Sequence, residues 1–171
     1  MSKLFSKIII AVIAIAFTTF GTCDLALASV WDKDTEVDLT ANSVLTVYRS
    51  PNCGCCGKWL EHVRDNGFKV RDIKTEEMTA LKQKYRIPSE LTSCHTAIVN
   101  GYVIEGHVPA EDIKRFLAEN PKANSDESQM TGLTVPGMVI GSPGMEEKDI
   151  KQPFQILAFN NKGKIAVFNE Y

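Results

Sequence analysis

The chain has 171 residues, of which 44% are hydrophobic, and a formal net charge of −2. A sequence of this size and composition is typical of one folded domain with a hydrophobic core. The nearly balanced charge provides no basic surface to attract nucleic acid or anionic lipid, and we expect neither as a partner.

The N-terminal segment 1–28 has the pattern of a secretory signal peptide. Two lysines precede an apolar run from Ile8 to Phe20, and Ala26-Leu27-Ala28 supplies small residues for cleavage. The run is about 13 residues long, shorter than the roughly 20 that a membrane-spanning helix needs. We therefore predict an exported, periplasmic protein whose mature form does not span a membrane. Attachment as a lipoprotein through Cys23 is the alternative.

The folded domain is predicted to begin at Val44, after a polar, flexible lead-in over residues 29–43. The segment from Val44 to Tyr48 is rich in residues that favour strands and precedes a turn cluster, so we expect a buried strand there. From Cys55 the apolar residues recur at helical spacing as far as Asn66-Gly67, which predicts a helix.

The next part of the sequence predicts a strand, a helix, a β-hairpin and another helix. Asn100-Gly101 marks the hairpin, because this pair readily adopts the positive φ angles of a type I′ turn. Pro109 opens the last helix, which ends at Asn120-Pro121. The expected elements are strand 68–73, a helix between 75 and 87, strands 96–99 and 102–105, and helix 109–120.

This order of elements is that of a thioredoxin-like α/β fold, which we predict as a single domain over residues 44–171. Residues 122–130 are expected to form a polar linker, and residues 133–145 a loop rich in proline and glycine. Two alternating segments, 154–160 and 164–169, predict a C-terminal β-hairpin extension.

Three of the five cysteines lie within four residues, Cys53-Gly54-Cys55-Cys56, where the first strand gives way to the first helix. Cys53 and Cys56 have C-x-x-C spacing, and the N–H groups of a helix start favour thiolates. Cys55 is one thiol more than a redox pair requires. Neighbouring Cys55 and Cys56 could pair only through a strained ring, so ordinary disulfides do not explain the cluster. The extra thiol indicates a metal site.

Cys94 precedes the third predicted strand, in the loop that faces the redox motif of thioredoxin-like folds. That loop usually carries a cis-proline, but here Cys94 and His95 stand in its place. The arrangement predicts a site of four thiolates, from Cys53, Cys55, Cys56 and Cys94, with His95 as a further candidate ligand.

Copper(I) is the metal that best matches these donors. It is soft, binds two or three thiolates, and can form a multinuclear cluster through bridging sulfur. Zinc sites usually combine two separated pairs of ligands, and iron–sulfur proteins are generally loaded before export, so both metals fit less well.

Four other side chains are weaker candidates. Met138 and Met145 lie in a loop with a repeated Pro-Gly-Met pattern, and thioether sulfur binds Cu(I), although methionines under a long loop more often fill a core. We interpret His107 as a loop or capping residue, which is the commoner role at a strand end. We interpret His62 as a residue on a solvated helix face.

Four motifs carry a resemblance to a known family, namely Cys-Gly-Cys-Cys-Gly-Lys-Trp at 53–59, Ser-Cys-His-Thr-Ala at 93–97, Gly-Tyr-Val-Ile-Glu-Gly-His-Val-Pro-Ala at 101–110, and the Pro/Gly/Met-rich segment 135–146. With them the sequence resembles the periplasmic CopG-type copper-resistance proteins, from about Val44 to the C-terminus. The resemblance implies a thioredoxin-like fold and copper bound by the four cysteines. It also implies a role in interconverting Cu(I) and Cu(II).

Three functions fit these residues. The first is copper binding with redox turnover, as a copper oxidoreductase. The second is a passive buffer or chaperone that passes copper to an efflux system or another periplasmic chaperone. The third is a thiol–disulfide oxidoreductase in which Cys53 attacks and Cys56 resolves. The lack of a proline before the third strand argues against the third function.

Overall fold

The structure is a computed structural model that describes residues 43–120, 129–148 and 150–171. The predicted signal peptide, Cys23 and nearly all of the predicted lead-in lie outside the described residues, as does most of the polar linker. The boundaries expected for these segments therefore stay predictions.

One mixed seven-stranded sheet organises the described residues, in the order β2-β1-β3-β4-β5-β6-β7. Strand β1 pairs in parallel with β2 and antiparallel with β3, and β3 forms an antiparallel hairpin with β4. The α/β class and the order of the first seven predicted elements are confirmed. The elements are β1 (Val44–Arg49), α2 (Gly54–Asp65), β2 (Lys69–Lys74), α3 (Met78–Lys84), the 3₁₀ helix η1 (Ser89–Leu91), β3 (His95–Val99), β4 (Tyr102–Glu105), α4 (Ala110–Glu119), β5 (Gly132–Thr134), β6 (Gln155–Phe159) and β7 (Ile165–Glu170).

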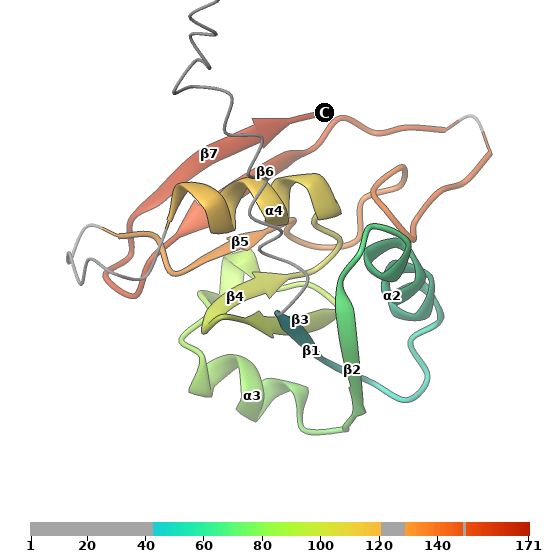
Figure 1. The fold of residues 1–171 in the computed structure, drawn as a ribbon, viewed down its shortest axis with the longest axis horizontal. Helices are drawn as coiled ribbons and strands as arrows, with labels where there is room; N and C mark the ends of the chain where they lie inside the picture. Colours follow the sequence, from blue (N-terminus) through green and yellow to red (C-terminus); the bar gives the residue numbers. More distant parts are fainter. Residues whose placement is uncertain (1–42, 121–128, 149) are drawn as a thin grey trace, which may run out of the picture. The chain divides into compact units, whose positions relative to one another are not determined.

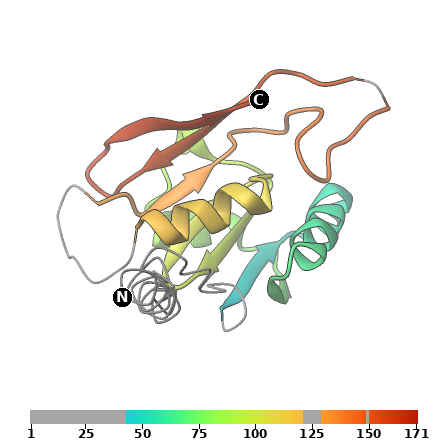
Figure 2. The same ribbon diagram turned by 45° about the horizontal axis from the view of Figure 1, so that its top comes forward.

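Helices lie on both sides of the sheet (Figures 1 and 2). On one face, Trp59 of α2 and Phe116 of α4 belong to the main hydrophobic core. On the other face, a smaller cluster includes Ile87, which follows α3. Val103 and Ile104 are adjacent in β4 and belong to different clusters, as the two-residue period of a strand requires. The main core holds α2 through Trp59 and the residues that follow it, directly after the cysteine motif.

The hairpin turn between β3 and β4 is formed as predicted. Asn100 and Gly101 both have positive φ, at 49° and 75°. The resulting register pairs Thr96 with Glu105. This places the end of β4 opposite the start of β3, next to Cys94.

The C-terminal region differs from the prediction. The expected loop 133–145 begins inside β5, which pairs in parallel with β4. A strand of three residues is too short to show a period, and it starts at Gly132, where a Cβ would lie 2.4 Å from the carbonyl oxygen of Val103. Because β5 also pairs with β6, the hairpin β6-β7 continues the main sheet.

Candidate metal centre

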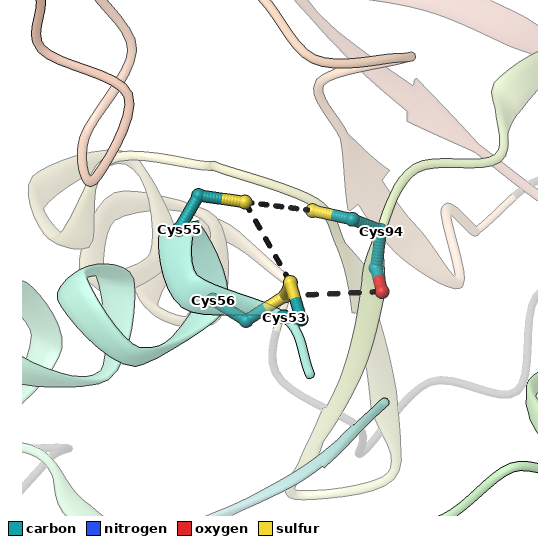
Figure 3. A group of neighbouring side chains, drawn as sticks. All are labelled: Cys53, Cys55, Cys56 and Cys94. Atoms are coloured by element: carbon teal, nitrogen blue, oxygen red, sulfur yellow. Dashed lines mark hydrogen bonds between the residues drawn. A yellow bond between two sulfur atoms is a disulfide. The ribbon is translucent and has the colours of Figure 1, made fainter. Parts of the chain in front are cut away.

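The first turn of α2 presents three sulfurs at one end of the sheet (Figure 3). Cys53 is the N-cap residue, with extended backbone angles (φ −80°, ψ 98°), and the helix begins at Gly54. A disulfide joins Cys53 to Cys56, while Cys55 and Cys94 are free thiols. The C-x-x-C pair is thus oxidised in this structure.

Arg49 fixes the segment that leads into the helix. Its Nε and Nη2 donate to the two carboxylate oxygens of Asp72 on β2, at 2.9 and 2.7 Å. Its Nη1 donates to the carbonyl oxygen of Cys53 at 3.3 Å. A two-point arginine–carboxylate contact sets the direction of the guanidinium as well as its position. Strands β1 and β2 therefore hold the cysteine motif at its first residue.

A buried carboxylate holds the loop that carries Cys94. Glu105, at the end of β4, is fully buried and forms an ion pair with Lys82. It also accepts hydrogen bonds from Ser93 N and Thr96 Oγ1, both at 2.6 Å. Burial raises the pKa of Glu105, although Lys82 and these donors oppose the shift. The contacts hold the backbone at Ser93 and the side chain of Thr96, on either side of Cys94.

The structure brings the four predicted cysteine ligands together, with all sulfurs within 4.8 Å of one another. Cys53 Sγ lies 3.6 Å from Cys55 Sγ, and Cys55 Sγ lies 4.0 Å from Cys94 Sγ. Cys56 Sγ lies 3.9 Å from the carbonyl oxygen of Cys94 (Figure 3). Cys56 is fully buried, and the other three are partly exposed. The cluster is therefore partly accessible to solvent.

His107 lies in the loop after β4, as expected from the sequence, but the structure also places it beside the cysteine cluster. It is fully buried, and its Nε2 is 2.9 Å from Cys94 Sγ. The sequence signal was Gly106-His107 directly after a strand that pairs with the Cys94 segment. The position of the His107 ring also depends on Pro143, 36 residues later. The carbonyl oxygen of Pro143 lies 2.7 Å from His107 Nδ1. A contact between residues so far apart cannot be predicted from a local sequence pattern.

His95 is a second buried imidazole at the cluster. Its Nδ1 lies 3.6 Å from Cys94 Sγ, and its ring centroid is 4.3 Å from that of Trp59. Burial lowers the pKa of His95 well below its usual value, with further contributions from His107 and Lys82. Burial likewise lowers the pKa of His107. Both rings are therefore neutral at pH 7, the form in which imidazole binds metal.

The thiol of Cys94 is protonated at neutral pH. Burial, followed by the nearby Cys55 thiol, raises the pKa of Cys94 to about 12. A bound cation must displace this proton, because the thiolate is the metal ligand. Metal binding at Cys94 therefore releases a proton.

The two Pro-Gly-Met segments lie against the two pieces of chain that carry the cysteines. Gly137 N donates to the carbonyl oxygen of Thr92, and the Gly137 carbonyl accepts from Ser93 Oγ. A Cβ on Gly144 would lie 2.6 Å from Trp59 N and 2.9 Å from the carbonyl oxygen of Cys55. The loop thus packs on both sides of the cluster.

The remaining candidates are placed as follows. Met138 exposes 64% of its surface, and Met145 is half-buried, so neither plugs the core as methionines under a loop often do. His62 accepts a hydrogen bond from Ala110 N through Nε2, which links α2 to α4. His62 is half-buried, not on a solvated face as expected, and its contact is with the first residue of α4.

The geometry and donor chemistry define a class of protein. A mixed α/β domain presents a cluster of thiols and imidazoles that is capable of binding a soft metal ion. Among the described residues, no helix is both long and apolar enough to cross a membrane.

Comparison with known proteins agrees with this class. Residues 91–145 match a family described as a protein of unknown function, DUF411. Two solved structures named copper resistance protein CopG, forms 2 and 1, are 39% and 41% identical to the chain. Each comparison covers 75% of this chain, with 98% and 96% of the other chain and a TM-score of 0.67. No curated protein sequence matches significantly. The chain belongs to the CopG-type copper-resistance family.

Proposed function

We propose that this chain is an exported, periplasmic copper-binding protein that holds Cu(I) on the thiolates of Cys53, Cys55, Cys56 and Cys94. The observation that carries the proposal is the convergence of four sulfurs within 4.8 Å, from two segments far apart in the sequence. Thiolates are soft ligands that suit Cu(I), and the spacing of these four differs from the two separated pairs of a usual zinc site. The names of the two similar structures support copper, and the family is consistent with export.

The fold we propose for this function is thioredoxin-like. Support comes from the strand order β2-β1-β3-β4, in which β1 is parallel to β2 and antiparallel to β3. In such a fold the first helix starts beside the loop before β3, and this is where the four cysteines lie.

Redox turnover forms the second part of the proposal. Two thiolates that close to a disulfide release two electrons, which reduce two Cu(II) ions to Cu(I). Cys53 and Cys56 are the pair for this reaction, because they form a disulfide in the structure. Their reduction by the reverse reaction restores the four-thiolate site. Interconversion of Cu(I) and Cu(II) thus needs no cofactor beyond the cysteines.

Further donors extend the copper site in this proposal. His95 and the half-buried Met145 are candidates beside the cluster, and Met138 is a candidate at the surface, where Cu(I) could first meet a thioether. From such a position the protein would exchange copper with an efflux system or a periplasmic chaperone.

The copper proposal is tested with Cys55→Ser and Cys94→Ser in reduced protein loaded with Cu(I). Both changes should lower the copper bound per chain by a third or more and leave the circular dichroism spectrum unchanged. Reduced wild-type protein loaded in the same way is the reference. Sulfur ligation is read by X-ray absorption, and the number of ions by elemental analysis. An unchanged copper content in both variants would refute the proposal.

The disulfide between Cys53 and Cys56 supports a second candidate, a thiol–disulfide oxidoreductase. Insulin reduction by metal-free protein separates the two functions. Fast turnover that survives Cys55→Ser would favour thiol exchange, because that chemistry needs only the C-x-x-C pair. Under the copper proposal we expect slow turnover.

A further inference from the structure

The two edges of the sheet differ in how they are protected. β2 forms one edge, and most of its residues are charged, namely Lys69, Arg71, Asp72 and Lys74. Charges along an edge strand oppose pairing with a further strand. β7 forms the other edge (Figure 1), and Glu170 is the only charged residue in it. Among the described residues no strand pairs with its outer side, so β7 can accept one.

Apolar side chains and outward-facing backbone groups occur together on β7. Ile165 exposes 43% of its surface and Val167 exposes 53%. The backbone of Lys164 faces β6, because its carbonyl oxygen accepts a hydrogen bond from Asn160 N at 3.0 Å. Backbone groups alternate in direction along an antiparallel strand, so those of Ile165 and Val167 point away from β6. Both residues therefore offer an N–H, a C=O and an apolar side chain to a neighbouring strand.

We propose that β7 pairs antiparallel with β7 of a second copy of this chain, about a two-fold axis at Ala166. Ile165 of each copy then lies opposite Val167 of the other. This register uses the outward N–H and C=O groups of both residues in both copies. A two-fold axis forms each contact twice, as in most homodimers. The two sheets thereby join into one continuous sheet.

The charges at the ends of β7 favour a second copy as the occupant of this edge. Lys164 precedes the strand and Glu170 ends it, and both are exposed. A bulge at Phe168 adds one residue, which shifts Glu170 back by one position along the strand. In the proposed register Glu170 of each copy therefore lies beside Lys164 of the other, and opposite charges stabilise such cross-strand neighbours. A parallel arrangement would instead bring like charges together.

The bulge also limits the strength of the association. Regular pairing extends over the few residues before Phe168, and so short a ladder buries less surface than a permanent dimer does. We expect a reversible dimer with a dissociation constant of about 10 to 100 μM. The interface contains none of the candidate metal ligands, so the dimer does not depend on the proposed copper function.

Sedimentation equilibrium of reduced, metal-free protein tests for the dimer, at concentrations from roughly tenfold below to tenfold above this dissociation constant. The reductant keeps free thiols from linking two chains. Amide hydrogen exchange, measured by NMR, then locates the contact. The amides of Ile165 and Val167 should become protected as the dimer forms, whereas the amide of Ala166, which faces β6, should be protected at every concentration. A monomer throughout the range would overturn the proposal and leave this edge to a strand of another protein. A dimer in which Ile165 and Val167 stay unprotected would also overturn it.

Variants test the register. Val167→Lys places a charge in the centre of the interface and should raise the dissociation constant about tenfold or more. Ile150→Lys, the matched change at an apolar residue that is 54% exposed and lies outside β7, should leave the constant unchanged. Lys164→Glu should weaken the dimer about threefold, and adding Glu170→Lys should restore it, because the double change exchanges the two charges. The positions are exposed, and circular dichroism checks that each variant is folded. Wild-type affinity in Val167→Lys, an equal loss in Ile150→Lys, or no recovery in the double variant would each overturn the proposal.

Discussion

Two buried carboxylates organise two different regions of this molecule. Glu105 ends β4 and fastens the loop around Cys94 through Ser93 N, Thr96 and Lys82. Asp112 lies in the first turn of α4 and fastens the C-terminal strand, accepting from Tyr171 Oη at 2.6 Å and from Asn169 Nδ2 and Arg115 Nη2 at 2.9 Å.

The difference lies in what each carboxylate holds. The partners of Glu105 flank Cys94, so its contacts position a candidate ligand. The partners of Asp112 lie in α4 and at the C-terminal end of β7, and among the described residues they form no hydrogen bond with a cysteine. The contacts of Glu105 therefore position part of the candidate metal site, and those of Asp112 hold the C-terminal strand against α4.

The largest effect is expected for Glu105→Gln. The amide cannot neutralise Lys82 and cannot accept from all the donors around it. Breaking a buried ion pair by removing one partner costs about 3 to 5 kcal/mol of stability. Because the Lys82 side chain is 14% exposed and stays in contact with water, we expect a loss at the low end, about 3 kcal/mol. Urea unfolding measures this loss. Cu(I) affinity, measured by competition with a chelator, should also fall, because the Cys94 loop loses its anchor.

Asp112→Asn is the control for that comparison. It keeps one acceptor oxygen and loses a charge-assisted hydrogen bond, which costs about 1.5 to 3 kcal/mol. Cu(I) affinity should stay at the wild-type value in protein that remains folded. If both variants lose copper affinity equally, Glu105 acts only through overall stability, and the distinction between the two regions is wrong.

This contrast also shows which features the sequence could reveal. The cysteine motif was predictable because its chemistry lies within four residues at a strand–helix junction. The βαβαββα order was predictable because each element has its own period and turn signals. Glu105 and His107 were not recognised, because their functions arise from contacts with Ser93, Cys94 and Pro143 that form only when separate segments meet. β5 was missed because three residues show no period.

The two Pro-Gly-Met segments provide a sharper test within the site region. Gly137 and Gly144 have φ of 72° and 83°, so alanine at either position costs about 1 to 2 kcal/mol in backbone strain. A Cβ on Gly137 meets nothing within 4 Å, whereas one on Gly144 collides with the backbone of α2. Gly144→Ala should therefore destabilise more than Gly137→Ala.

Gly144→Ala should also move the neighbouring Pro143 carbonyl away from His107. We expect weaker Cu(I) binding for Gly144→Ala, because its Cβ also meets the carbonyl oxygen of Cys55, and little change for Gly137→Ala. Thermal unfolding and a Cu(I) titration of reduced protein measure the two effects. Equal Cu(I) affinities in the two folded variants would show that the loop does not shape the copper site.

The smallest effect on stability is expected at His62. Its Nε2 accepts a hydrogen bond from Ala110 N at 3.0 Å, which links α2, the helix of the cysteine motif, to α4, the helix of Asp112. Burial lowers the pKa of His62 from 6.5, against the opposing charges of Glu146 and Asp65. A histidine with a lowered pKa in the folded state binds its proton more readily in the unfolded state. It therefore contributes stability above pH 6.5, and this contribution is lost as the pH falls below that value.

Urea unfolding at pH 7.5 and at pH 5.5 measures this contribution. The free energy of unfolding should fall less between the two pH values for His62→Gln than for wild type, because glutamine does not titrate. The same pH dependence in both proteins would mean that protonation of His62 does not affect stability at the junction between α2 and α4.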